Sequence, residues 1–240
     1  MRLDKYLVEK KYFSSRARAK EAIECGEVLV NNKIVHAPDQ EVSVGVTIEV
    51  KNSFPWVSRG ALKLLAALDT FHIDPAGLTV LDIGASTGGF TEVLLSRGAK
   101  LVYAVDVGHE QMNKKLKSDP RVVSMEGVDV RSLTLKDFPE GVGLVVGDLS
   151  FISLSKVFPV IKTLVPKGAS IVLLVKPQFE VGIGGTKKGI VRDTEKQAKA
   201  LTNVISDALS FGFRLEGQRE SPVAGGSGNR EYLIHLSVLA

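Results

Sequence analysis

A turn of small residues follows a short apolar stretch in this 240-residue chain, and it is the segment best suited to hold a ligand. Residues 80–83 are typical of a buried strand, residues 84–89 include three glycines, and an amphipathic helical pattern begins near Phe90. Glycine lets a backbone approach a ligand closely, and the first N–H groups of the following helix are free to donate to it. The sequence therefore predicts a ligand site here; the alternative is a turn that only packs a helix on a sheet.

Two common phosphate-binding motifs fit this turn poorly. A P-loop needs lysine where Phe90 stands, and a dinucleotide fingerprint needs glycine where Ser86 stands. The pattern hydrophobic-Asp-hydrophobic-Gly-x-x-x-Gly-Gly-Phe resembles motif I of class I methyltransferases, which bind S-adenosylmethionine (SAM). The resemblance implies that the methionine part of the cofactor is surrounded by Asp82, Gly84, Ala85, Ser86, Thr87, Gly88, Gly89 and Phe90.

Further acidic residues are candidates for the rest of the cofactor. Asp106 ends the predicted strand 101–105, about 20 positions after the glycine turn, where an acidic residue can hold ribose hydroxyls. A plain turn aspartate is the alternative for Asp106. The methyltransferase resemblance places Asp129 near the adenine amino group, although a helix cap is an equally simple reading, and it places Asp148 and Leu149 beside the cofactor.

Four charged residues are expected at the same edge of the sheet. Asp148 and Lys176 follow the apolar strands 144–146 and 171–175. Lys63 interrupts an apolar helical run, and Glu231 follows a glycine-rich loop. Ligands in open parallel sheets bind beyond the carboxyl ends of the strands, so these residues can converge on the ligand site. Two ion pairs without a catalytic role are the alternative.

The order Lys63, Asp148, Lys176, Glu231 resembles the catalytic tetrad of FtsJ-like ribose 2′-O-methyltransferases. The local sequences Gly147-Asp148-Leu149-Ser150, Lys176-Pro177-Gln178 and Gly228-Asn229-x-Glu231 carry the resemblance. Together with the N-terminal module described below, the chain resembles the TlyA (hemolysin A) family over residues 2–236. The resemblance implies that Lys176 steers a ribose hydroxyl and takes its proton, that Lys63 adds a second positive charge, and that the two carboxylates orient both ammonium groups.

Other methyl acceptors fit the sequence less well. The Asn/Asp-Pro-Pro-aromatic motif of many amino-methyltransferases is absent, because Leu149, Ser150 and Phe151 follow Asp148. Methylation of carbon 5 through a covalent adduct needs a cysteine, and Cys25 belongs to the other module. An oxygen acceptor remains, and the family resemblance implies ribosomal RNA methylated at cytidine.

The first 20 residues carry seven basic side chains against two acidic ones, whereas the whole chain has a net charge of +4. Two short basic helices followed by a compact hairpin resemble the RNA-binding fold named after the fourth protein of the small ribosomal subunit. In that fold the outer face of the second helix meets RNA phosphates, contacts that add affinity but little sequence information. A solvated basic helix is the alternative. The candidate RNA-binding residues are Arg2, Lys5, Arg16, Arg18 and Lys20.

The chain divides into a small α+β RNA-binding domain (1–50), a linker (51–58) and a catalytic domain (59–240). The predicted fold of the last is α/β, a doubly wound, mostly parallel sheet of seven strands as in class I SAM-dependent methyltransferases. In the first domain we expect helices starting near Leu3 and near Ser14 or Ser15, then strands over 28–30, 33–35 and 42–50. Trp56 is expected to pack in the linker.

The composition is ordinary for a globular protein, with 44% hydrophobic and 24% charged residues. A single cysteine and four histidines without metal-ligand spacing predict a reducing compartment and no metal. No signal sequence or membrane-length apolar run is evident, so we expect a cytoplasmic protein. The predicted partners are ribosomal RNA or ribosomal subunits, and the oligomeric state stays open. The alternatives are a membrane-active hemolysin and a non-catalytic RNA-binding or ribosome assembly factor.

Overall fold

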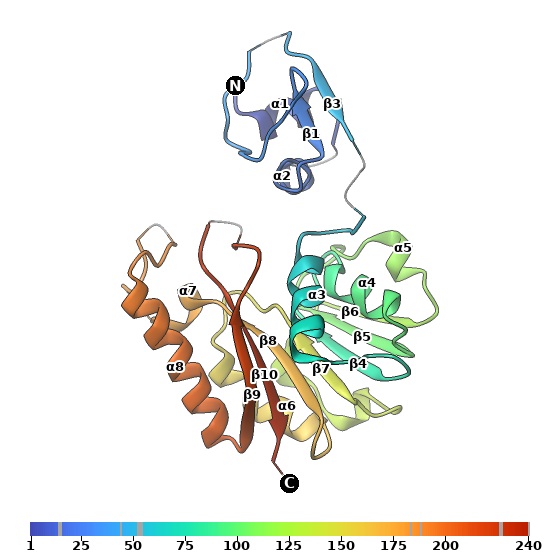
Figure 1. Ribbon diagram of the computed structural model, residues 1–240. Coiled ribbons are helices and arrows are strands. Elements are labelled where there is room, and N and C mark those ends of the chain that lie inside the picture. The colour runs from blue at the N-terminus through green and yellow to red at the C-terminus, as the bar shows by residue number, and fades with distance from the viewer. Residues whose placement is uncertain are drawn as a thin grey trace. The chain divides into compact units, whose positions relative to one another are not determined.

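The structure is a computed structural model that describes residues 1–13, 16–43, 45–51, 55–182, 184–187, 189–225 and 228–239 (Figure 1). They form two compact units, Met1–Arg59 and Gly60–Ala240, each with a hydrophobic core of its own. Ser14 and Ser15, expected to begin the second helix, lie outside the described residues, as do residues 52–54 of the expected linker. Trp56 is half-buried.

The N-terminal unit has two helices and a three-stranded antiparallel sheet with the order β2-β1-β3. Leu3, Leu7 and Ile23, spaced for one face of each helix, are fully buried in its core. The expected α+β module is therefore confirmed. Its elements are α1 (Leu3–Glu9), α2 (Arg16–Glu24), β1 (Val28–Val30), β2 (Lys33–Ile34) and β3 (Ile48–Val50).

A two-residue turn joins β1 to β2, as predicted. Asn31 and Asn32 have φ values of 50° and 63°, the left-handed region that asparagine tolerates better than most residues and that type I′ hairpin turns require. Val30 and Lys33 consequently pair across the hairpin.

The prediction of a strand over residues 42–50 is wrong for the first half of this range. Only Ile48–Val50 pairs with β1. Gly45 lies in a turn with φ of 92°, and the Val42 N–H donates to the Met1 carbonyl at 2.8 Å, so this part of the segment is attached to the start of the chain instead. Val44 lies outside the described residues. Alternating valines are compatible with a strand, but the turn at Gly45 interrupts the alignment with β1.

The second unit is built on a seven-stranded sheet with the order β6-β5-β4-β7-β8-β10-β9 (Figure 1). The strands from β6 to β8 are parallel, and β10 runs antiparallel to both of its neighbours. This confirms the predicted doubly wound sheet. The strands are β4 (Thr79–Ile83), β5 (Leu101–Asp106), β6 (Val122–Glu126), β7 (Leu144–Gly147), β8 (Ser170–Val175), β9 (Phe213–Glu220) and β10 (Tyr232–Val238).

The strand order reverses at β4. From β4 the chain proceeds to β5 and β6 on one side and then returns to place β7 and β8 on the other. In open α/β sheets a crevice forms at the carboxyl ends of the strands where this reversal occurs, because the two following connections leave in opposite directions. The glycine turn comes directly after β4, so it lies at this position.

Helices cover both faces of the sheet. Leu81 and Ile83 point to a core shared with Ile161 of α6 and Ala208 of α8, whereas Val80 alternates to the other face. The helices are α3 (Gly60–Phe71), α4 (Gly89–Ser96), α5 (Lys114–Lys117), α6 (Phe158–Leu164), α7 (Pro177–Glu180) and α8 (Thr194–Ser210), with short 3₁₀ helices η1 (Val130–Ser132), η2 (Leu135–Asp137) and η3 (Leu154–Lys156).

Candidate active site

The turn after β4 has the backbone geometry that its glycines suggested. Gly84 and Gly88 have φ values of 82° and 97°, and Ser86 also adopts a left-handed conformation with φ of 47°. A Cβ atom on Gly84 would lie 2.9 Å from the carbonyl oxygen of Asp148, and one on Gly88 would lie 2.4 Å from a methyl group of Leu116. The turn thus packs closely against the end of β7 and against α5, and a larger residue would force them apart.

Asp82 is completely buried behind this turn. Its Oδ2 accepts a hydrogen bond from the Thr91 hydroxyl at 2.7 Å, whereas Oδ1 has no hydrogen-bond partner among the described residues. Burial, and to a smaller extent the charge of Asp148, raises the pKa of Asp82 to about 7 even though the Thr91 bond lowers it. A buried oxygen without a partner costs free energy unless a bound group or water satisfies it.

Asp106 at the end of β5 holds the backbone on both sides of the crevice. Its Oδ2 accepts from the Ser86 N–H at 2.8 Å and its Oδ1 accepts from the Gly108 N–H at 2.7 Å. Asp106 therefore stabilises the turn at the end of its strand, as the alternative interpretation of this residue predicted. Its contact with a ribose stays a prediction.

Asp129 caps η1, as its alternative interpretation predicted. Its Oδ1 accepts from the Arg131 N–H at 2.8 Å, and its two oxygens also form a bidentate pair with the Arg131 guanidinium, with an Nη2–Oδ2 distance of 2.5 Å. These hydrogen bonds lower the pKa of Asp129 to about 2. The predicted contact with adenine stays a prediction, and Arg131 is a cationic neighbour that the sequence did not identify.

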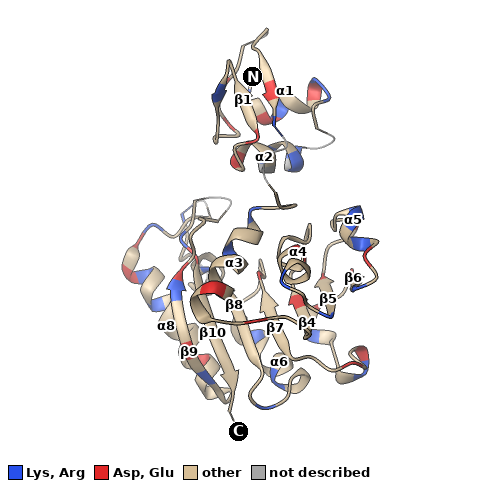
Figure 2. Ribbon diagram, turned by 45° about the vertical axis from the view of Figure 1, so that its right-hand side comes forward, with Lys and Arg blue, Asp and Glu red and all other residues tan. Residues whose placement is uncertain are grey.

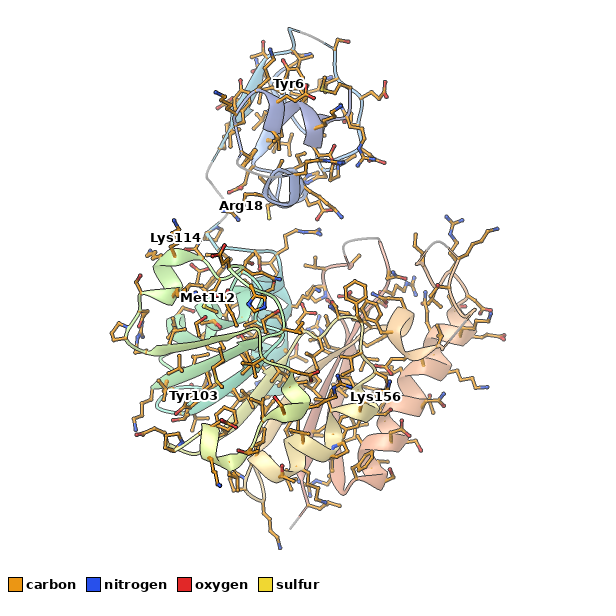
Figure 3. All side chains as sticks on the ribbon, turned by 180° about the vertical axis from the view of Figure 1, so that it is seen from behind. Tyr6, Arg18, Tyr103, Met112, Lys114 and Lys156 are labelled. Atoms are coloured by element: carbon orange, nitrogen blue, oxygen red, sulfur yellow. The ribbon has the colours of Figure 1, made fainter. Side chains whose placement is uncertain are left out.

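A cavity of about 570 Å³ opens beside the turn. Six of the predicted cofactor residues line this cavity. Ala85, Gly89 and Phe90 are instead buried in the turn and its helix, and Thr87 and Gly88 also do not line the cavity. Lys156 of η3, labelled in Figure 3, also lines it. The six predicted residues are Gly84, Ser86, Asp106, Asp129, Asp148 and Leu149.

The four charged residues singled out in the sequence form one connected cluster. Lys63 Nζ lies 2.7 Å from Glu231 Oε2 and 3.4 Å from Asp148 Oδ2. Lys176 Nζ lies 2.6 Å from Asp148 Oδ1. Asp148 is thus shared between two ammonium groups that come from α3 and from the end of β8. The structure therefore brings together all four residues, which the sequence separates by up to 168 positions.

The electrostatics of this cluster favour the charged forms of Lys63 and Asp148. Lys63, Lys176 and Glu231 are only 8%, 9% and 2% exposed. Burial lowers the pKa of Lys63, but the charges of Asp148 and Glu231 outweigh it and the pKa is raised. Burial likewise raises the pKa of Asp148, and the two lysines outweigh it so that the pKa is lowered. The cluster is a chain of alternating charges beside the cavity, in which one carboxylate holds both amines.

Two residues that follow Asp148 were not identified from the sequence. The Ser150 hydroxyl accepts a hydrogen bond from Lys176 Nζ at 2.7 Å. Phe151 is 91% exposed with φ of 64°, and its ring lies 5.0 Å from the ring of Phe179 in α7. An aromatic residue at this position of the local sequence Asp-Leu-Ser-Phe was the only available signal, and it does not by itself distinguish an exposed ring from a buried one.

The loop over residues 181–192 is anchored by an asparagine next to the cluster. Asn229 is 3% exposed; its Oδ1 accepts from the Val191 N–H at 3.0 Å and its Nδ2 donates to the Gly189 carbonyl at 2.9 Å. The motif Gly228-Asn229-x-Glu231 therefore joins this loop to the strand end that carries Glu231.

In the N-terminal unit, the candidate RNA-binding residues lie on or next to α1 and α2, coloured blue in Figure 2. Asp4 forms ion pairs with Arg2 and Arg16, which lower its pKa to about 2 although burial raises it. The other three candidates also have partners: Lys5 pairs with Glu9, Lys20 pairs with Glu24, and Arg18 donates to the Val57 carbonyl. The role of these five residues in RNA binding stays a prediction.

The described residues contain neither a membrane-spanning helix nor a cluster of metal ligands. None of their helices has the length and apolar character needed to cross a lipid bilayer. Within the described ranges, no group of three or more His, Cys, Asp or Glu side chains converges in a way that could hold a metal ion.

Comparison with known protein families divides the chain at nearly the same place as the structure. Residues 56–238 match the FtsJ-like methyltransferase family, and residues 1–48 match the S4 domain. A crystal structure of a SAM-dependent methyltransferase from Mesorhizobium loti shares the fold, with a TM-score of 0.53 and 16% identity over 72% of this chain and 96% of its own.

Some relatives match both units. The 16S/23S rRNA (cytidine-2′-O)-methyltransferase TlyA of Mycobacterium tuberculosis is 44% identical over 98% of this chain and 89% of its own length. Hemolysin A of Brachyspira hyodysenteriae is 40% identical over 99% of this chain and 100% of its own. A solved hemolysin-named structure from Streptococcus thermophilus has a TM-score of 0.80 and 40% identity, and it covers 100% of this chain and 88% of its own. The chain therefore belongs to the TlyA (hemolysin A) family, in which an S4 domain precedes an FtsJ-like methyltransferase domain.

Proposed function

We propose that this protein transfers the methyl group of SAM to a ribose 2′-hydroxyl of ribosomal RNA, at a cytidine. The observation that carries the proposal is the cluster of Lys63, Asp148, Lys176 and Glu231 beside the cavity at the glycine turn. The M. tuberculosis relative, named as a 16S/23S rRNA (cytidine-2′-O)-methyltransferase, supports both the reaction and the substrate.

The residues around the cavity fit SAM. Its volume of about 570 Å³ is within the range of small-molecule sites. Asp106 and Asp129 suit the ribose and the adenine, and Leu149 supplies an apolar surface. Asp82 does not line the cavity, but its unpaired Oδ1 lies behind the turn that does, where its charge suits the cationic methionine end. When bound, SAM supplies a methyl group on a positively charged sulfur, which is already a good electrophile.

The chain's own residues then position the acceptor. A ribose hydroxyl reacts well only when its oxygen is held close to the methyl carbon, roughly 3 Å away, and when its proton is drawn away. Neither Lys63 nor Lys176 lines the cavity, but both neighbours of Lys176, Asp148 and Ser150, do, so we take Lys176 as the amine nearer the acceptor. We assign to Lys176 the orientation of the 2′-oxygen and, once the amine has released one of its own protons to solvent, acceptance of the hydroxyl proton.

Lys63 and Glu231 influence the hydroxyl only through other residues. Lys63 is as buried as Lys176, but the partners of the two lysines differ: Glu231, which pairs with Lys63, does not line the cavity, whereas Ser150, which bonds Lys176, does. The positive charge of Lys63 beside Asp148 keeps that carboxylate ionised, and the carboxylate in turn holds Lys176. The four residues thus form a series of ion pairs that positions Lys176, the amine nearest the acceptor.

The S4 domain supplies the affinity for RNA. Arg2, Lys5, Arg16, Arg18 and Lys20 would contact phosphates, which adds binding free energy through counterion release. Residues 51–58 would link this domain to the catalytic domain, and the reaction would take place in the cytoplasm on ribosomal RNA or ribosomal subunits. The exposed ring of Phe151 at the mouth of the cavity offers a stacking surface for a base turned out of its helix.

Methyl transfer from labelled SAM to ribosomal RNA of cells that lack the gene tests the proposal. The wild-type protein should add a 2′-O-methyl group to a cytidine, located by mass spectrometry of RNA fragments. The Lys176→Ala variant should lose this activity, while a Lys167→Ala variant should keep it because Lys167 precedes the opposite end of β8. RNA binding by the wild-type protein without any methyl transfer would instead identify a non-catalytic assembly factor, and lysis of lipid vesicles without transfer would identify a membrane-active protein.

A further inference from the structure

Ser150 has no role in the transfer as described so far, yet it contacts the lysine nearest the acceptor. Lys176 Nζ donates to Ser150 Oγ at 2.7 Å and lies 2.6 Å from Asp148 Oδ1. Ser150 is exposed and lines the cavity, whereas Lys176 is 9% exposed. The serine hydroxyl is therefore the part of this cluster that connects the Lys176 ammonium with the cavity.

The hydrogen-bond geometry of Lys176 shows what the hydroxyl contributes. An ammonium group has three N–H donors. Ser150 Oγ accepts from one of them at 2.7 Å, and the other acceptor in hydrogen-bond geometry, the Asp148 carbonyl oxygen, is 3.5 Å away and too distant to fix a direction. Asp148 Oδ1 lies 2.6 Å from Nζ as an ion pair but outside hydrogen-bond geometry, so it attracts the ammonium without fixing the direction of an N–H. Without Ser150 Oγ, the ammonium at the end of a flexible four-carbon chain would keep this attraction but no short hydrogen bond among the described residues, and it could rotate.

The backbone around Ser150 is held in an unusual conformation. The next residue, Phe151, has φ of 64°, a region that costs free energy for any residue other than glycine. Its ring is 5.0 Å from that of Phe179 in α7, the helix that begins directly after Lys176. The segments after β7 and after β8 are therefore joined at several points, among them the Ser150–Lys176 hydrogen bond, the two rings, and the hydrogen bonds that the Ser153 hydroxyl and the Leu154 N–H donate to the Glu180 carboxylate. Strain of this kind persists where the surroundings hold it, and it is concentrated at functional sites.

We propose that Ser150 is a positioning residue for methyl transfer: its hydroxyl holds the Lys176 ammonium in one orientation toward the ribose 2′-oxygen. This inference rests on the function proposed above. Because the amine is already oriented when the ribose enters, the chemical step does not include the cost of ordering it. Ser150 acts through Lys176 and takes no part in the bonds that form and break.

The test compares Ser150→Ala and Ser150→Thr with the wild-type full-length protein, using single-turnover methyl transfer to ribosomal RNA. The Ser150→Ala variant should react about 10- to 100-fold more slowly, since the misplacement of one reacting group has effects of this order. Its half-saturating RNA concentration and its SAM affinity should stay within about twofold of wild type. Threonine keeps the hydroxyl, so the Ser150→Thr variant should recover most of the rate.

The split between rate and binding distinguishes positioning from a purely structural role. A serine that only maintains the segment would change SAM binding and RNA binding together with the rate, whereas a serine that orients Lys176 changes the rate alone. The control is Ser153→Ala, which removes a hydrogen bond to Glu180 in the same segment without touching Lys176. This control should keep the wild-type rate.

Each other outcome has a separate meaning. If Ser150→Ala retains the wild-type rate while Lys176→Ala is inactive, the inference about Ser150 is overturned and the proposed function stands. A slow Ser150→Ala variant with equally weakened SAM binding, or one whose rate Ser150→Thr does not recover, would also overturn the inference, because the serine would then only maintain the segment. If Lys176→Ala is fully active, the proposed function itself fails.

Discussion

Lys63 Nζ and Glu231 Oε2 lie 2.7 Å apart, although 168 positions of the chain separate the two residues. Their side chains are 10% and 2% exposed, so this is a buried ion pair. Such a pair gains little over well-packed apolar residues, but removing one member leaves a buried charge without its partner. The pair therefore makes different predictions for single and double variants.

The Glu231→Gln variant should be strongly destabilised and inactive. Losing the charge of one partner of a buried pair costs about 3–5 kcal/mol, and Lys63 would keep a single carboxylate partner, Asp148 at 3.4 Å. The double variant Lys63→Met/Glu231→Leu should recover most of the free energy of unfolding, measured by denaturant titration, but none of the methyl transfer. Recovery of activity in the double variant would contradict the assigned role of the pair.

The effect of pH on this pair has a definite sign. The pKa of Lys63 is raised above 10.5, so its contribution to stability is fully present below pH 10.5 and is lost as the pH rises through the folded-state pKa. The difference in unfolding free energy between wild type and the Lys63→Met variant should be constant from about pH 7 to 9 and should shrink above about pH 10.5. A difference that already shrinks near neutral pH would show that Lys63 is not stabilised as an ammonium.

The Gly84→Ala variant should lose both stability and SAM binding. Alanine is strained at φ of 82°, which costs about 1–2 kcal/mol, and its Cβ would lie 2.9 Å from the Asp148 carbonyl oxygen. Gly141→Ala is a matched control, because Gly141 has φ of 71° but nothing within 4 Å of the added Cβ. Calorimetry should show weaker SAM binding for Gly84→Ala alone. Equal SAM binding by the two variants would mean that the approach of Asp148 does not matter for the cofactor.

The raised pKa of Asp82 should make the free energy of unfolding depend on pH. Its pKa is raised from 3.8 to about 7, so its contribution to stability is fully present below pH 3.8 and is lost as the pH rises through about 7. The Asp82→Asn variant, which stays neutral, should gain free energy of unfolding relative to wild type between these pH values, by at most about 4 kcal/mol at 1.36 kcal/mol per pKa unit. A gain that is the same at pH 4 and pH 8 would show that Asp82 does not titrate in this range.

The same carboxyl group should make SAM binding depend on pH. Ionised Asp82 attracts the cationic methionine end of SAM, so wild-type affinity measured by calorimetry should increase from pH 6 to pH 8. The Asp82→Asn variant should bind more weakly and with little change over this interval. Parallel pH profiles for the two proteins would remove Asp82 from the methionine site.

Lys20 should contribute to RNA binding and not to the cofactor site. Replacing it by alanine should weaken binding to ribosomal RNA and reduce the slope of log K against log salt by about one, as expected for the loss of one phosphate contact. SAM binding should be unchanged. Lys167→Ala, in the catalytic domain, provides a control with the same loss of charge. Equal effects of the two substitutions on RNA binding would argue against a specific role for α2.

The strands and the polar residues at their ends could be predicted from the sequence because both depend on local patterns. Parallel strands are buried on both faces and form continuous apolar runs, so Asp106, Asp148 and Lys176 stand out as the first charged residues after them. Tertiary contacts decided what could not be predicted. The turn at Gly45 follows from the pairing of Val42 with the start of the chain, which no local pattern records.

Helix α8 shows the same limit. The residues that α8 buries do not follow from their hydrophobicity alone. Val204 is buried, whereas Leu209 is 50% exposed and Gln197 is buried instead. The Gln197 amide can be buried because it donates to the Val191 carbonyl at 2.5 Å, and that carbonyl belongs to a loop whose position the sequence does not specify. Ser150 escaped notice for a related reason, since its significance lies in a lysine 26 positions away.

The position of Glu231 has a consequence for synthesis. It directly precedes β10, the last strand, which inserts between β8 and β9 and runs against both. Domains near the N-terminus generally fold first while the chain emerges from the ribosome. The S4 domain can therefore mature early, whereas the charge cluster is completed only after the final strand has been made. A nascent chain that ends before β10 would therefore bind nucleic acid without methylating it.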